Sequence, residues 1–152
     1  MPAKERQANK YTIKLIAKSK IYSILPLLKV LNDKIPEKTL KTRLDEMTKQ
    51  GYKCVGVYDG SKLIGISGLW ILTKYYIGRH IEPDNVVILP EYRDKGIGAL
   101  LMQWIYEYSK KMGCVGSELN CYVTNRGGQK FWFEEGYKIL GFHFQKIYGS
   151  EK

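Results

Sequence analysis

Cysteine, histidine and long apolar runs are all scarce in this chain of 152 residues. The three cysteines, Cys54, Cys114 and Cys121, form no Cys-x-x-Cys pair, which argues against a zinc site or a disulfide framework. The two histidines, His80 and His143, stand alone in the sequence, so no metal is expected. No apolar run reaches membrane-spanning length and no signal peptide opens the chain. These absences predict a cytoplasmic protein with reduced thiols and no membrane contact.

Arginine clusters interleaved with aromatic residues are also absent, although the formal net charge is +10. A stacking platform for nucleic acid needs that combination. Lysine dominates the positive charge and is scattered along the chain, with the densest run from Lys4 to Lys20. We interpret this as a solvated basic surface, with a nucleic-acid footprint as the less favoured alternative.

The hydrophobic periodicity predicts one compact α/β domain over residues 10–152, preceded by a loose polar arm over residues 1–9. Strands are expected over 10–17, 52–58, 62–71, 81–89, 115–123 and 137–148. Helices are expected over 20–31, from 36 to a stop at 51, from 97 to a stop at 113, and from 125 to 135. The second and third strands form a hairpin about Asp59-Gly60, and residues 73–79 form a loop.

The most informative segment runs from an apolar stretch at Val86 through Pro90 and a charged turn to Gly96-Ile97-Gly98. An amphipathic stretch follows at once, which predicts a strand, a loop and a helix beginning near Ile97. Free N–H groups and the helix dipole make a helix start an anion site, and glycine lets the backbone approach a ligand closely. The segment therefore predicts a pyrophosphate bound at this helix start.

The spacing of the glycines separates the families that use such a loop. A Walker loop needs G-x-x-x-x-G-K-[ST], which is absent, and a dinucleotide fingerprint needs a third glycine, which is also missing. The chain instead has R-x-x-G-x-G from Arg93 to Gly98, behind the lead-in V-x-L-P-E-Y-R.

This segment strongly resembles the acyl-CoA loop of the GNAT superfamily of N-acetyltransferases, and the expected order of strands and helices resembles theirs. The resemblance covers roughly residues 10–148, with specific motifs over 84–137. It implies a mixed, mostly antiparallel sheet flanked by helices, and acetyl-CoA as co-substrate. The residues it implies for binding acetyl-CoA are Val86, Val87, Ile88, Arg93, Asp94, Lys95, Gly96, Ile97, Gly98, Ala99, Asn125 and Trp132.

Two carboxylates precede the expected cofactor strand. Glu82 and Asp84 lie two residues apart, so on a strand both side chains face one way. Resemblance to polyamine-acetylating GNAT members places Asp84 at the position of their catalytic glutamate, nine residues before Arg93. Asp84, with Glu82, is therefore our candidate for removing the amine proton. The alternative is that both acids sit at a solvated strand end.

The second segment with a GNAT-like pattern is N-R-G-G-Q-K-F-W-F-E-E-G-Y, residues 125–137. The resemblance implies that Asn125 bonds the pantetheine region; the alternative is a helix cap. Trp132 stands where many GNAT enzymes have a tyrosine that protonates the leaving thiolate, and an indole N–H cannot do so. Tyr137, Tyr122 or water would then serve, or the thiolate leaves unassisted.

The resemblance implies direct transfer of acetyl to a primary amine in a ternary complex. The short C-terminal part resembles small bacterial members, including aminoalkylphosphonate acetyltransferases. The alternatives are an acyl-CoA-binding sensor or interaction protein without the catalytic acid, and a basic nucleic-acid-binding protein. The positive charge favours a small acceptor that is neutral or carries an acidic group. A homodimer is compatible with the sequence.

Overall fold

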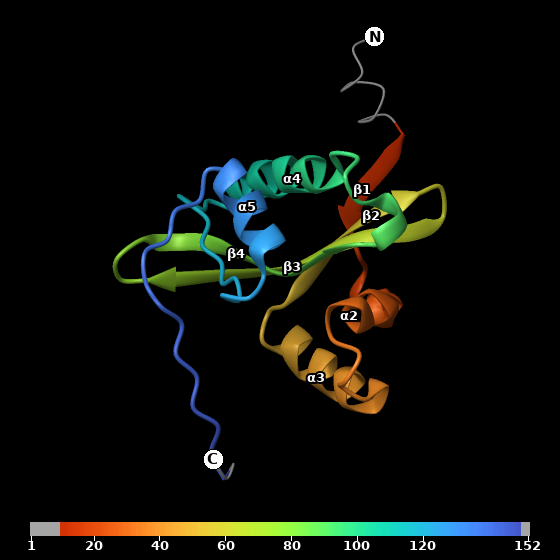
Figure 1. Cartoon of the computed structure of the whole chain (residues 1–152), viewed down its shortest axis with the longest axis horizontal. Helices are drawn as coiled ribbons and strands as arrows, with labels where there is room; N and C mark the ends of the chain where they lie inside the picture. The colour runs from red at the N-terminus through yellow and green to blue at the C-terminus, as the bar shows by residue number, and fades with distance from the viewer. Residues whose placement is uncertain (1–9, 150–152) are drawn as a thin grey trace. The chain divides into compact units, whose positions relative to one another are not determined.

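The computed structural model describes residues 10–149, so the predicted arm over residues 1–9 lies outside the described residues. Its elements in chain order are β1 Tyr11–Leu15, η1 Lys18–Ile24, α2 Leu25–Leu31, α3 Glu37–Lys49, β2 Lys53–Asp59, β3 Lys62–Lys74, β4 Gly78–Ile88, η2 Pro90–Tyr92, α4 Ile97–Lys111 and α5 Arg126–Glu134 (Figure 1). None of these helices has the length and apolar character needed to cross a membrane. Two compact units divide between Leu119 and Asn120, and each is described by itself.

The first unit contains a sheet of four strands in the order β1-β2-β3-β4, with every neighbouring pair antiparallel. The predicted hairpin at Asp59-Gly60 is confirmed, and Gly60 takes the positive φ of 58° that the tight turn requires. The predicted loop over 73–79 is too long. Thr73 pairs with Arg79 and Lys74 with Gly78, so the ladder between β3 and β4 continues almost to the tip of this hairpin. The loop was predicted from the polar and aromatic composition of this segment, but pairing between the two strands kept its backbone extended.

The predicted strand over 115–123 is reduced to a single parallel bridge between Ile81 and Ser117. The Ile81 N–H donates to the Gly116 carbonyl and the Glu118 N–H donates to the Ile81 carbonyl, each at 3.1 Å. The next bond of this ladder would need an N–H at position 83, and proline has none. Pro83 thus ends the pairing, and β4 keeps an unpaired edge beyond Ile81 among the described residues.

Helices cover both faces of this sheet (Figure 1). On one face, α2 and α3 pack on side chains such as Cys54 and Ile66, and Tyr52 closes this core. On the other face, α4 lies along the sheet and buries four residues of its apolar stripe, Ile97, Leu101, Met102 and Ile105. The predicted helix over 97–112 is therefore confirmed. Its N-terminal end follows β4 through the short η2 turn, which places the helix start beside the strand end.

The second unit contains α5, as predicted, but no strand over 137–148 among the described residues. A strand needs a hydrogen-bonded partner, and an apolar alternating pattern does not supply one. The prediction from periodicity was therefore wrong for this segment.

Candidate functional site

The acidic side chains of β4 lie on one face of the sheet, as predicted from their spacing. Glu82 pairs with Trp70 and Asp84 with Gly68, without a register shift between the two pairs. His80, two residues earlier, shares the same face. It has no exposed surface, and its Nε2 lies 2.7 Å from Glu82 Oε2. His80 was not connected with Glu82 from the sequence, because the strand was expected to begin at residue 81, whereas β4 begins at Gly78.

A β-bulge interrupts β4 immediately after these acids. Gly68 pairs with Asp84 and Ile66 with Val87, so Ser67 opposes two residues, Asn85 and Val86. Asn85 has a φ of 51°, in the left-handed region that asparagine tolerates better than most residues. The bulge re-aims the strand directly before the segment predicted to contact acetyl-CoA.

Three side chains hold this bulge. Asp84 Oδ1 accepts the backbone N–H of Asn85 at 2.8 Å, and Tyr52 donates its hydroxyl to Asn85 Oδ1 at 3.2 Å. Trp70 Nε1 donates to Asp84 Oδ2 at 3.1 Å, and its ring lies 5.1 Å from the Tyr52 ring. Asp84 is therefore held by two donors. No role for Tyr52, Trp70 or Asn85 was predicted from the sequence, because their contacts join residues on different strands or loops.

The backbone of the predicted cofactor strand alternates between a paired and an open side. The Leu89 N–H donates to the Ile64 carbonyl of β3 at 2.8 Å. Because successive N–H groups of a strand point to opposite sides, the N–H of Ile88 faces away from β3, where the ladder with residues 115–118 has already ended. Val87 is buried, whereas Val86 and Ile88 are partly exposed. Ile88 thus offers a backbone donor along the open edge.

The glycine loop has the geometry predicted for an anion site. Asp94 and Gly96 both take left-handed backbone angles, with φ of 59° and 76°. Gly96 is the N-cap of α4, and no side chain caps this helix start. The first intrahelical bond runs from the Leu100 N–H to the Gly96 carbonyl, so the N–H groups of residues 97–99 precede the helical ladder. This arrangement fits a pyrophosphate, because the donors converge where the dipole is positive.

The charged residues of the loop have separate contacts. Arg93 Nε donates to the Ile88 carbonyl at 3.0 Å, which satisfies an acceptor on the open side of β4 and ties the loop to the strand. Lys95 Nζ lies 5.4 Å from the centre of the Tyr92 ring. Asp94 supplies the left-handed turn. The structure therefore gathers the predicted loop residues at one end of β4, with Arg93 in a positioning contact.

The remaining predicted residues belong to the second unit. Asn125 caps α5, because its Oδ1 accepts the Gly128 N–H at 2.9 Å. A side chain at Gly128 would approach Asn125 to 2.4 Å, which explains the small residue there. The Trp132 ring contacts Phe131 and Tyr137, with ring centres at 4.8 and 5.4 Å. Asn125 is therefore a helix cap and Trp132 packs on its neighbours, and the approach of Asn125, Trp132 and Tyr137 to acetyl-CoA stays a prediction.

Known relatives of similar sequence match parts of the chain. A stretch of 65 residues is 34% identical to the aminoalkylphosphonate N-acetyltransferase of Salmonella typhimurium, and covers 43% of this chain and 42% of that protein. A stretch of 86 residues is 24% identical to the thialysine N-epsilon-acetyltransferase of Mus musculus, and covers 57% of this chain and 48% of that protein. The matched stretches thus span less than half the length of either relative.

Solved structures with the same fold match nearly the whole chain. An aminoglycoside N-acetyltransferase solved in complex with CoA superimposes with a TM-score of 0.78 at 16% identity, over 92% of this chain and 95% of that one. This likeness confirms the predicted α/β fold.

The family model described as Acetyltransferase (GNAT) family matches residues 21–142, which include the bulge, the glycine loop and α5. The match spans most of the chain and agrees with the R-x-x-G-x-G loop at the start of α4. The chain therefore belongs to the GNAT family of acetyltransferases.

Proposed function

We propose that the chain transfers the acetyl group of acetyl-CoA directly to a small primary amine in a ternary complex. The observation that carries the proposal is the uncapped start of α4, behind a left-handed Gly96 and directly after the bulged strand. An uncapped helix start leaves polar N–H groups that need an acceptor, and a pyrophosphate supplies several acceptor oxygens at once.

The open edge of β4 would orient the reacting carbonyl. Bound acetyl-CoA supplies an acetyl thioester, and the Ile88 N–H is the backbone donor that the strand aims away from β3. A fixed donor at an oxygen that gains negative charge is worth about 3–4 kcal/mol when it is removed. The bulge at Asn85 supports this role, because it re-aims the residues that follow it.

The acids of β4 would handle the proton of the amine. An acceptor amine is protonated in water and must lose a proton as its nitrogen forms the amide bond and the C–S bond breaks. Asp84 retains acceptor capacity beside its two donors, because a carboxylate has about four lone-pair sites. Its short side chain favours relay through water, and Glu82 on the same face is the second acceptor.

The leaving thiolate would depart without an obligatory protein acid. Its thiol has a pKa of about 8.5, so departure as the anion is tolerable near neutral pH. Tyr137 stays the candidate for assistance, and Trp132 packs between Phe131 and Tyr137 in the second unit.

The acceptor class follows from charge and from the names of the relatives. The chain carries a net charge of +10, which opposes the approach of a polycation and favours a neutral or acidic amine. The Salmonella relative is named for aminoalkylphosphonates and the mouse relative for thialysine, both of which are small amines. We therefore propose a small amine with an acidic group as acceptor.

Calorimetric titration with CoA tests the loop. Gly98 is the second residue of α4, and Gly98→Val places a branched side chain where the backbone must approach the pyrophosphate, so CoA binding should be lost in a folded protein. The matched control is Gly127→Val, at the second residue of α5, where an added side chain meets no atom within 4 Å. Unchanged CoA affinity in folded Gly98→Val would contradict the site.

A thiol-release assay with acetyl-CoA and amines of graded charge then tests turnover. Release of thiol that depends on a small amine supports the transferase. CoA binding without turnover of any amine would favour the sensor instead.

A further inference from the structure

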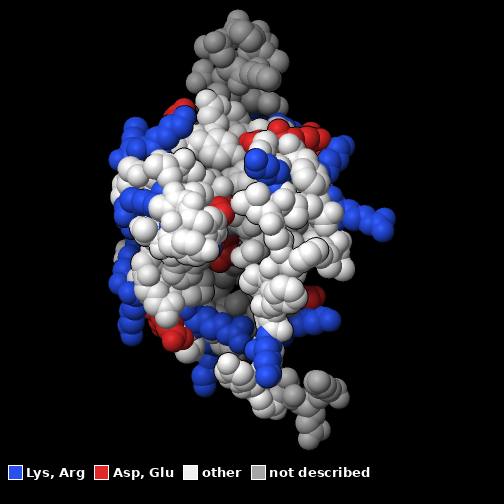
Figure 2. Space-filling model, turned by 90° about the vertical axis from the view of Figure 1, so that its left-hand side faces the viewer, with Lys and Arg blue, Asp and Glu red and all other residues white. Residues whose placement is uncertain are grey.

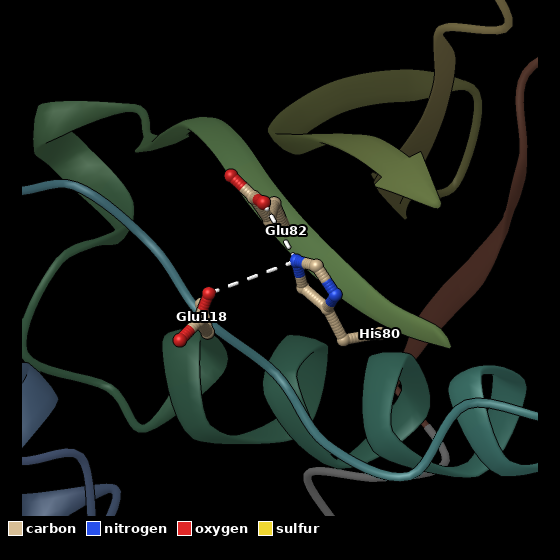
Figure 3. Close-up of side chains that lie close together, drawn as sticks. All are labelled: His80, Glu82 and Glu118. Carbon is tan, nitrogen blue, oxygen red and sulfur yellow. Dashed lines mark hydrogen bonds and ion pairs between the residues drawn. The ribbon is translucent and has the colours of Figure 1, made fainter. Parts of the chain in front are cut away.

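A buried histidine and two carboxylates form a compact cluster on the face of β4 opposite α4 (Figure 3). His80 and Glu82 come from β4, and Glu118 comes from the segment that runs beside it through the Ile81–Ser117 bridge. His80 Nε2 lies 2.7 Å from Glu82 Oε2 and 3.7 Å from Glu118 Oε1. Within residues 10–149, the ligand atoms of these three residues all lie within 4.8 Å of one another.

The orientation of the His80 ring is fixed by its other nitrogen. Nδ1 lies 2.9 Å from the Gly78 carbonyl, and a carbonyl can only accept, so Nδ1 carries the hydrogen. The other ring nitrogen, Nε2, then points at the Glu82 carboxylate. At 2.7 Å, this nitrogen and the carboxylate oxygen hold a cation between them, either a proton on Nε2 or a metal ion. The ring has no exposed surface from which water could solvate this nitrogen.

The surroundings of the cluster resemble the outer shell of a metal site. A ligating histidine usually donates its second ring N–H to a backbone carbonyl or carboxylate, as His80 does to Gly78. Tyr76 donates its hydroxyl to Glu118 Oε1, which orients the second carboxylate. Lys74 Nζ lies 3.1 Å from Glu82 Oε2 and 3.8 Å from Glu118 Oε1, so a cation already neutralises this pair. The Lys74 side chain is 41% exposed, which lets the ammonium move into solvent when another cation enters.

We propose that His80, Glu82 and Glu118 bind one divalent transition-metal ion, with zinc as the reference ion, in place of the Lys74 ammonium. Zinc bonds to nitrogen and oxygen donors at about 2.0–2.2 Å, so ligands in a tetrahedral arrangement lie roughly 3.3–3.6 Å apart. The separations from His80 Nε2, 2.7 and 3.7 Å, lie on either side of this range. One imidazole and two carboxylates suit zinc and its transition-metal neighbours, whereas magnesium prefers oxygen donors and water. The proposal concerns binding and does not depend on the acetyl transfer proposed above.

Titration of the full chain with zinc chloride, after removal of metals with a chelator, tests the proposal by calorimetry. We expect one zinc ion per chain, with magnesium unable to compete. Glu118→Gln removes a ligand charge at a partly exposed position and should weaken zinc binding at least about tenfold. The control is Glu91→Gln, which makes the same change at an exposed acid paired with Lys62 and should leave zinc affinity unchanged.

Lys74→Met distinguishes a metal site from an ion-pair network. In a metal site, loss of the competing Lys74 ammonium should tighten zinc binding. In a network of ion pairs that has lysine as its cation, the same substitution would remove the cation and weaken the network. Circular dichroism confirms that each variant is folded. The proposal is wrong if the chain binds no zinc, if Glu118→Gln binds zinc as tightly as the parent, or if Lys74→Met does not bind it more tightly.

Discussion

At the residue scale, Asp84 combines a structural contact with a proposed chemical one. Its two oxygens accept from the Asn85 backbone N–H and from Trp70 Nε1, so it holds the bulge that re-aims the cofactor strand. The same carboxylate is our candidate acceptor for the amine proton. The two contributions are separable, because the first affects stability and the second affects the pH dependence of turnover.

Asp84→Asn should lower kcat/KM most at neutral pH and recover as the pH approaches the pKa of the amine itself, since a deprotonated amine needs no base. A pH–rate profile measures this. Trp70→Phe is the control, because it removes the indole donor and leaves the carboxylate. If the pH–rate profile is unaltered in Asp84→Asn but changed in Glu82→Gln, then Glu82 and not Asp84 accepts the amine proton.

Trp132 should behave as a packing residue. Trp132→Phe keeps an aromatic ring beside Phe131 and Tyr137, so most of the turnover should remain. Trp132→Tyr should match or exceed it by restoring the residue usual at this position in the family. A loss of about a thousandfold in kcat for Trp132→Phe, as expected for a major acid–base or electrostatic group, would contradict this view.

Cys54 should be inert in the folded chain. The side chain has no exposed surface, and burial raises its pKa to about 12. Iodoacetamide near pH 8.5 should therefore leave Cys54 unmodified until the chain unfolds in urea, as mass spectrometry of its peptide would show. The Cys54 thiol ionises at a lower pH in the unfolded chain than in the folded one. It therefore lowers the free energy of unfolding as the pH rises from the ordinary pKa of a thiol towards the raised pKa in the folded chain. Rapid modification of Cys54 in the native protein would argue against the packing of β2.

At the element scale, the bulge in β4 is held by residues of two other segments. Tyr52 follows α3, and its ring lies against Gly68 of β3, while its hydroxyl reaches Asn85. Burial raises the pKa of Tyr52, so the phenol stays neutral and can donate this bond. The glycine at position 68 thus makes room for the ring that supports the bulge.

Gly68→Ala should destabilise the fold by about 1–3 kcal/mol, because the added Cβ would lie 2.4 Å from the Tyr52 ring in a packed core. Urea denaturation measures the difference. Tyr52→Phe removes only the hydroxyl contact and should cost less, about 0.5–1.5 kcal/mol. Equal stability of Gly68→Ala and the parent would mean that the ring is not confined there.

At the scale of the whole molecule, lysine supplies most of the positive charge and is scattered along the sequence. On the face drawn in Figure 2, lysine and arginine side chains lie at several separate places and do not gather into one patch. A distributed charge steers small anions without forming a nucleic-acid footprint. The family match agrees with an acetyltransferase.

The charge predicts which acceptors are used. An aminophosphonate or amino acid should give a higher kcat/KM than spermidine. This difference in kcat/KM should become smaller as salt screens the repulsion between spermidine and the positively charged protein. Steady-state rates at two salt concentrations measure this. Better use of spermidine at both concentrations would show that local acids in the site outweigh the net charge of +10.

The sequence by itself determined the elements whose signals are local. The glycine pair at 96 and 98, the apolar stripe of the following helix and the turn at Asp59-Gly60 each specify backbone geometry within a few residues, and each was predicted correctly. The strands predicted at 115–123 and 137–148 did not form, because a strand exists only where a neighbouring strand supplies hydrogen bonds. Beside residues 115–123, Pro83 lacks the backbone N–H that the next hydrogen bond would need. Tertiary structure alone decided that Tyr52 and Trp70 hold the bulge, and that His80 meets Glu118 across 38 positions of chain. Such contacts depend on strand register and crossing segments, which no local pattern encodes.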